Sequence, residues 1–120
     1  VAVDALASRS LKRLCRTVQL ADTGITPGSG VGNHRMGLTR DTLGVPVIAV
    51  GVPTVVEAAT LAADLLCTDD LPDLNEGREL LVTPKDIDSQ VRDLAKVIGY
   101  GLSMALQPGI SLKELELLLS

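Results

Sequence analysis

The chain has 120 residues, of which 46% are hydrophobic and 22% are charged, a composition that fits one folded domain and excludes the disordered and low-complexity classes. Tyr100 is the single aromatic residue, so the core must be aliphatic. A net charge of -4 without aromatic stacking platforms argues against a nucleic-acid partner. No apolar run reaches the length of a membrane span, so we expect no membrane partner.

The charges are distributed unevenly along the chain. Residues 1–40 contain six Lys or Arg and two Asp, whereas residues 41–120 contain five Lys or Arg and thirteen Asp or Glu. This asymmetry indicates a basic rim near the N-terminal segment. Two cysteines and one histidine are too few for a zinc site. We therefore expect no metal, no cofactor, and reduced thiols in an intracellular protein.

The N-terminal residues predict a short strand, then a turn or helix, and a second strand. Val1-Ala2-Val3 is apolar and ends at Asp4, and residues 5–16 contain good helix formers. Residues 17–21 alternate in polarity, as in a strand that ends in a turn. Residues 24–37 contain five glycines and one proline, which predicts a loop.

The middle of the chain predicts a buried strand followed by a helix. Residues 45–51 form an almost unbroken apolar run, which is typical of a strand covered on both faces. Thr54, with Glu57 three positions later, fits a capping box. We therefore expect a helix from Thr54 to about Leu66, followed by an acidic surface connection over residues 67–79.

Two helices are predicted in the C-terminal part. Thr83-Pro84 has the pattern of an N-cap followed by a proline at the first helical position, and a long apolar stripe follows it. Pro108-Gly109 ends this helix. Ser111 and Glu114 then cap a last, leucine-rich helix.

Strands that alternate with helices predict a single α/β domain over residues 1–120, with a mainly parallel sheet and helices on both faces. In such sheets ligands bind beyond the carboxyl ends of the strands. Asp4, the glycine-rich loop and the Gly51–Thr54 turn are expected to meet there. The absence of an initiator methionine before an apolar triplet indicates an N-terminally truncated fragment or a processed product.

Three features at this edge carry candidate chemistry, each with a structural alternative. Asp4 is either a functional carboxylate or the N-cap of the following helix. Asp22-Thr23-Gly24 resembles the active-site triplet of pepsin-like proteases, but those enzymes are all-β, so a local turn is favoured. Residues 27–33 can wrap an anion with backbone N–H groups, yet they lack the P-loop ending and the dinucleotide spacing. A structural or substrate-lining loop is therefore preferred.

Taken together, these segments resemble one family, the germination proteases of spore-forming bacteria. The resemblance rests on four stretches in the family's order, which cover most of the chain: Val1-Ala2-Val3-Asp4-Ala5-Leu6-Ala7-Ser8-Arg9, the run from Val18 to Asn33, the run from Thr42 to Val56, and the run from Leu81 to Asp88. The chain resembles the C-terminal part of these proteins. Its 67–79 connection looks shorter than theirs, and their N-terminal region is missing.

The resemblance implies an aspartic-type endopeptidase that degrades small acid-soluble spore proteins during germination. It also implies a fold similar to hydrogenase-maturation endopeptidases (phosphorylase/hydrolase-like), a homo-oligomer made as a zymogen, and a cytoplasmic location in the spore core. Asp4 matches one of the family's two catalytic aspartates, and the other belongs to the missing segment. The substrate-lining residues expected from the loop are Gly28, Ser29, Gly30, Gly32 and Asn33.

Because an aspartic mechanism needs two carboxyls that share a proton, we expect this chain alone to be inactive as a peptidase. The alternative is a non-catalytic α/β domain that binds an anion or a partner through the glycine-rich loop. A pepsin-like homodimer through Asp22 is a third possibility, and it requires an all-β structure.

Overall fold

The computed structural model describes residues 1–29, 35–69 and 75–119. Contacts divide them into two compact units, Val1–Lys85 and Asp86–Ser120. The single domain expected over residues 1–120 stays a prediction. Each unit is described by itself below.

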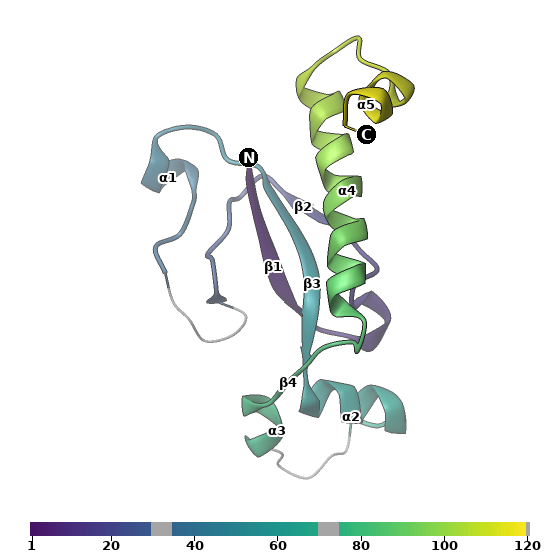
Figure 1. Cartoon of the computed structure of the whole chain (residues 1–120). Helices are drawn as coiled ribbons and strands as arrows, with labels where there is room; N and C mark the ends of the chain where they lie inside the picture. Colours follow the sequence, from purple (N-terminus) through teal and green to yellow (C-terminus); the bar gives the residue numbers. More distant parts are fainter. Residues whose placement is uncertain (30–34, 70–74, 120) are drawn as a thin grey trace. The chain divides into compact units, whose positions relative to one another are not determined.

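The first unit is built on a four-stranded sheet with β3 (Ala49–Glu57) at its centre. β1 (Ala2–Ser8) pairs with β3 in parallel, and β2 (Gln19–Ala21) pairs with it antiparallel. The short β4 (Leu81–Val82) is antiparallel to the end of β3. Figure 1 shows β1 and β3 running side by side. The valine-rich β3 is the most buried strand, as its apolar run predicts.

The sequence predicted a mainly parallel sheet, but the observed sheet is mixed. Among the described strands, only the β1–β3 pair is parallel. The sequence predicted a turn or helix over residues 5–16. In the structure, β1 continues through Ser8, and only a 3-10 turn, η1 (Leu11–Arg13), lies between β1 and β2. A β2 strand parallel to β1 would need a longer crossover connection. The likeness to hydrogenase-maturation endopeptidases stays a prediction.

β3 continues past the position where a helix was expected to start. Leu6 pairs with Pro53 and Ala7 with Val55, so Thr54 is an extra residue on β3. Proline has no N–H to give to the ladder, and a bulge is one of the places in a sheet where it is tolerated. Val56, two residues beyond the bulge, is fully buried. Because this valine is buried in the sheet, the chain stays extended here. It does not form the capping box that the spacing of its residues predicts.

Three α-helices complete the first unit. α1 (Arg40–Leu43) has a reciprocal capping box between Thr39 and Thr42. α2 (Ala58–Leu66) begins after Glu57, which forms no side-chain cap. α2 contacts β3, η1 and α3 (Asn75–Glu79).

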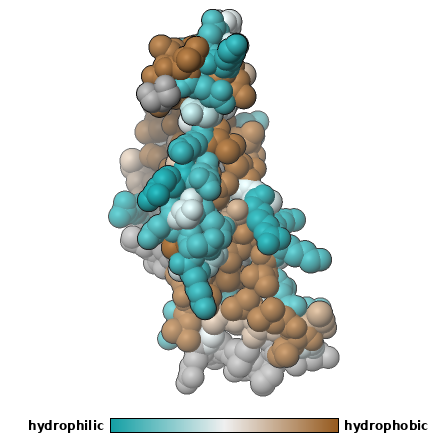
Figure 2. Space-filling view, turned by 45° about the vertical axis from the view of Figure 1, so that its right-hand side comes forward, coloured by the Kyte–Doolittle hydropathy of each residue, from teal (hydrophilic) through white to brown (hydrophobic). Residues whose placement is uncertain are grey.

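The second unit consists of α4 (Ile87–Leu106) and α5 (Leu112–Leu119). Thr83 was expected to cap α4, but its hydroxyl donates to the Thr54 carbonyl, and Asp86 is the N-cap. The predicted cap of α5 is confirmed, because Ser111 and Glu114 bond reciprocally. Figure 2 shows hydrophobic residues, in brown, at the surface of α5. No helix within the three described ranges is both long and apolar enough to cross a membrane.

Candidate functional site

Asp4 lies within β1, with four strand residues after it, and is half-buried. Neither the expected strand end nor the alternative helix N-cap is correct, because residues 5–8 pair with β3 instead of forming a helix. The Ala5 N–H donates to Asp4 Oδ1 at 2.9 Å. This bond orients the carboxyl group, while no described residue bonds to Oδ2.

A glycine separates Asp4 from Gln19 across the sheet. Both residues pair with Gly51, one from β1 and the other from β2. Paired residues project on the same face, so the two side chains flank a position that has none. Leu6 fills part of this space, since a Cβ on Gly51 would lie 2.8 Å from Leu6 Cγ. Asp4, Leu6 and Gln19 therefore share one face of the sheet.

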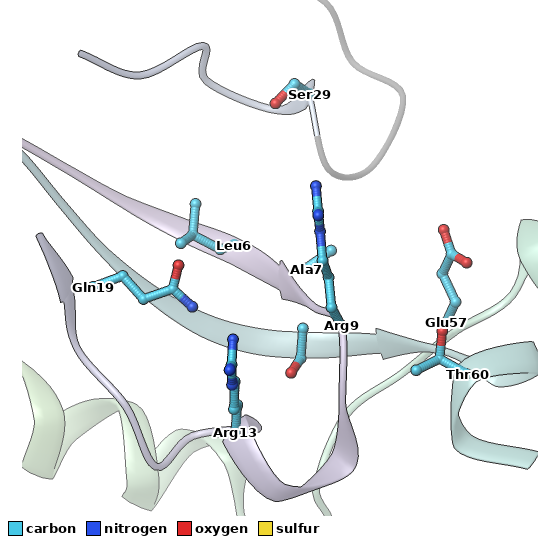
Figure 3. Close-up of a pocket in the computed structure, with 9 residues that line it drawn as sticks. Leu6, Ala7, Arg9, Arg13, Gln19, Ser29, Glu57 and Thr60 are labelled. Carbon is cyan, nitrogen blue, oxygen red and sulfur yellow. The ribbon is translucent and has the colours of Figure 1, made fainter. Parts of the chain in front are cut away.

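A pocket of about 720 Å³ opens near this face. Ser29 of the glycine-rich loop lines it, as does Gln19 at the start of β2. Figure 3 shows these side chains around the pocket. Asp4 itself does not line it, but lies two positions before Leu6 on the same face of β1. The lining residues are Leu6, Ala7, Ser8, Arg9, Arg13, Gln19, Ser29, Glu57 and Thr60.

Of the expected loop residues that the structure describes, only one lines the pocket. Ser29 lines the pocket, whereas Gly28 is absent from the lining and adopts a φ of +75°. That left-handed backbone favours glycine, so Gly28 has a conformational role in turning the loop. The other three expected residues, Gly30, Gly32 and Asn33, lie outside the described residues.

The two arginines of the pocket were missed as site residues. Arg9 follows β1 and Arg13 ends η1. The positive charge of residues 1–40 was the available signal, and it predicted only a basic rim. No pattern in the sequence joins these residues to Gln19 and Thr60, because the pocket forms only when η1 and α2 pack together.

The structure does not bring a second carboxyl to Asp4 among the residues it describes. Asp22 lies three residues beyond Gln19, or about 10 Å along the strand direction, and two strands across from Asp4. Glu57 lines the pocket, but lies six residues along β3 from Gly51, a distance of about 20 Å at the usual rise of a strand. Asp41 is exposed on α1.

The described residues contain no group of three or more His, Cys, Asp or Glu side chains placed to hold a metal ion. Cys15 is buried and Cys67 is exposed, and neither forms a disulfide. Both have a positive φ, of 53° and 52°, which is uncommon for a residue with a side chain. Cys67 ends α2 in this conformation.

Comparison with known proteins assigns the chain to a family. The family model described as germination protease matches residues 1–70, a range that contains β1, the glycine-rich loop and β3. The chain belongs to the germination protease family. Asp4, Ser29 and both arginines of the pocket lie inside the matched range.

Individual germination proteases are similar over nearly the whole chain. The protein of Clostridium perfringens is 41% identical over 145 residues, which cover 96% of this chain and 45% of the relative. That of Caldanaerobacter subterraneus subsp. tengcongensis is 42% identical, over 99% of this chain and 46% of the relative. That of Bacillus subtilis is 37% identical over 171 residues, or 92% of this chain and 46% of the relative.

The chain spans a little under half the length of these curated germination proteases. The matched stretches of 145 and 171 positions also exceed the 120 residues of the chain. The relatives therefore have additional residues inside the matched region, and the expectation that residues 67–79 form the shorter connection stays a prediction.

Proposed function

We propose that the protein to which this chain belongs is an aspartic-type endopeptidase that acts on small acid-soluble spore proteins. Asp4 supplies one of its two catalytic carboxyls, and the other comes from outside these 120 residues. One observation carries the proposal: the germination protease model matches the segment that contains β1 and Asp4. The homo-oligomer, the zymogen and the spore-core location implied by the resemblance belong to the same proposal.

The position of Asp4 suits one half of the aspartic mechanism. In that mechanism an ionised carboxyl takes a proton from water while a protonated carboxyl polarises the scissile carbonyl. The Ala5 N–H holds Asp4 Oδ1, and Oδ2 has no partner among the described residues. Oδ2 is then the oxygen that accepts the proton, which gives Asp4 the role of general base.

Leu6 fills part of the space beside this carboxyl, so a bound substrate must share this face of the sheet with it. Gly51 presents no side chain between Asp4 and Gln19, whose backbones lie two strands apart, or about 10 Å. An extended peptide that crosses this face passes from Asp4 towards the pocket. Ser29 then contacts it from the glycine-rich loop, as proposed for a substrate-lining residue.

Replacement of Asp4 by asparagine tests the proposal in a chimaera. The chimaera joins this chain to the part of the Clostridium perfringens protease that the chain does not match. We expect Asp4→Asn to lower the rate of cleavage of a small acid-soluble spore protein by about 10²–10⁴-fold, the usual contribution of a general base. Gel electrophoresis and mass spectrometry of the products measure the rate.

Asp22→Asn is the matched control, because it removes the same charge from an exposed residue beyond β2. We expect this variant to retain the activity of the parent chimaera. Equal rates for the parent and Asp4→Asn would contradict the role of Asp4. A large loss in Asp22→Asn would instead support the pepsin-like alternative.

A further inference from the structure

We propose that the second unit binds an amphipathic carboxylate, of the medium-chain fatty acid class, in a groove between α4 and the end of α5. The groove has a volume of about 440 Å³. None of its lining residues belongs to the site around Asp4, so this inference does not depend on the proposed peptidase function. The lining residues are Arg92, Ala95, Lys96, Gly99, Tyr100, Ser103 and Leu119.

A defined turn places α5 beside α4. Gly109 has a φ of +95°, a left-handed conformation that favours glycine, and the Ile110 N–H donates to the Gln107 carbonyl at 3.3 Å. Figure 1 shows α5, in yellow, turned back beside the end of α4. Leu115 is the buried residue of α5, and Leu119 follows one helical turn later on the same face. Leu119 therefore forms one wall of the groove.

The middle of the groove is apolar and open because Gly99 has no side chain. A glycine in the interior of a helix destabilises the helix. Apart from its neighbours within α4, no described atom lies within 4 Å of the position that a Cβ on Gly99 would take, so packing inside the unit does not require this glycine. Ala95, Leu119 and the ring of Tyr100 line the same space. An apolar ligand is favoured here, because its binding removes both apolar surfaces from water.

Two cations line the same groove. Arg92 and Lys96 are one helical turn apart on α4, so their side chains are neighbours on one face. In the described part of the chain, neither forms an ion pair or a side-chain hydrogen bond, although Asp88 and Asp93 are close to them in the sequence of α4. No acid is found among the described residues that line the groove. An anion that contacts both cations offsets their mutual repulsion, so the groove is complementary to negative charge.

The apolar and the charged parts together fit a carboxylate that carries an alkyl chain. Arginine presents paired N–H groups that match both oxygens of a carboxylate. Ser103 lies about 16 Å along α4 from Arg92, so an extended alkyl chain has a path past Gly99. The volume of the groove falls within the range of small-molecule sites. Acetate or phosphate would leave the apolar part of the groove exposed to water.

Titrations with three small molecules test the proposal on the 120-residue chain. Octanoate has both the charge and the alkyl chain, acetate has only the charge, and octanol has only the chain. The shifts of backbone amide signals in NMR spectra report binding, and we expect them to centre on α4 from Arg92 to Ser103 and on Leu119. We expect octanoate to bind at least about 10-fold more tightly than either of the others, because only octanoate combines charged hydrogen bonds with buried CH₂ groups.

A pair of glycine substitutions assigns the binding to the groove. Gly99→Leu fills the groove and should weaken octanoate binding by about 10-fold or more, because the alkyl chain loses its place of burial. Gly101→Leu is the matched control: Gly101 lies in the same helix with equally open surroundings, but does not line the groove. Both substitutions remove a glycine from α4, so they change its helix propensity equally. An equal loss of binding in the two variants would overturn the proposal.

Substitutions at the cations locate the carboxylate. We expect Arg92→Gln and Lys96→Gln each to weaken the binding of octanoate by about 10-fold, and to leave the binding of octanol unchanged. Lys113→Gln is the control, because Lys113 is exposed on α5 and does not line the groove. Circular dichroism confirms that each variant is folded. Equal losses in all three variants would show only a general effect of charge and would refute the assignment.

Three further outcomes would contradict the proposal. Octanol that binds as tightly as octanoate would identify a purely apolar groove, and acetate that binds as tightly would identify an adventitious ion only. Sedimentation that shows a dimer of the chain, lost in Gly99→Leu but kept in Gly101→Leu, would identify a second copy as the occupant. The cleavage rate of the Asp4→Asn chimaera bears on none of these measurements, so the two proposals can fail separately.

Discussion

Gly51 shapes the sheet face on which Asp4 lies, because it is the residue without a side chain in the row that also contains Gln19. Leu6 partly occupies the space above it. Leu6 also lines the pocket that contains Arg9 and Arg13, the arginine pocket. A larger residue at position 51 would compete with Leu6 for the same volume. The glycine therefore controls both the access to Asp4 and the position of the pocket wall.

We expect Gly51→Ala to lower the free energy of unfolding by about 1–3 kcal/mol, the usual cost of adding a group to a packed site. The added Cβ would lie 2.8 Å from Leu6 Cγ, too close for ordinary contact. Urea denaturation measures the loss. In a Leu6→Ala background the same substitution should cost clearly less, because the competing side chain is gone. An equal cost in both backgrounds would refute the proposed clash.

A strand that reaches Asp4 could be predicted from the sequence, but the surroundings of this residue could not. The apolar residues before it indicated a strand, and the helix formers after it indicated a helix. Residues 5–8 nevertheless pair with β3, because hydrogen bonding and burial in a sheet override weak local propensities. The arginine pocket depends on the bond between Leu11 and Asp64, which are 53 positions apart, and no local pattern encodes such a contact.

Capping patterns show how elements were predicted correctly or incorrectly. Ser111 and Glu114 form the reciprocal bonds that their spacing predicts, and α5 follows them. Thr54 and Glu57 have the same spacing, yet both lie within β3. The difference is the environment: β3 is buried between β1 and β2, whereas Ser111 and Glu114 are exposed. A capping pattern therefore predicts the start of a helix reliably only where the segment does not pair with strands elsewhere in the chain.

The cap of α5 should depend on pH. Hydrogen bonds from the Ser111 N–H and then from its hydroxyl lower the pKa of Glu114 from its ordinary value of 4.5. A carboxyl with a lowered folded-state pKa stabilises the fold above the unfolded-state pKa, and this contribution is lost as the pH falls through the folded-state value. We therefore expect the helicity of α5 to decrease in acid below pH 4.5, as measured by backbone amide and carboxyl NMR signals.

Substitutions at Ser111 provide the control for this pH dependence. Ser111→Ala removes the hydroxyl, so the pKa of Glu114 should move back towards 4.5 and α5 should begin less stably at neutral pH. Ser111→Thr keeps the hydroxyl and should preserve most of the effect. If both variants titrate like the parent chain, the hydroxyl contributes nothing to the cap.

At the scale of the whole molecule, the proposed aspartic mechanism requires a second carboxyl besides Asp4. The family model matches the part that holds Asp4, the glycine-rich loop and the arginine pocket. More than half the length of the relatives lies outside the matched region. The expectation that the second carboxyl lies outside these residues comes from chemistry, because two carboxyls must lie close enough to share a proton, and it stays a prediction.

We therefore expect the 120-residue chain to show no cleavage of a small acid-soluble spore protein, whereas the chimaera with the unmatched part of the Clostridium perfringens protease should cleave it. The reason is geometric. Among the described residues, the carboxyl that lines the pocket, Glu57, lies about 20 Å along β3 from the row of Asp4, too far to share its proton. Mass spectrometry of the substrate after incubation with each protein at equal concentration measures the difference. Cleavage by the chain alone, abolished by Asp4→Asn, would contradict this expectation. It would show that the second carboxyl comes from these residues or from a second copy of the chain. The variants Glu57→Gln and Asp22→Asn would then test whether Glu57 or Asp22 is that carboxyl.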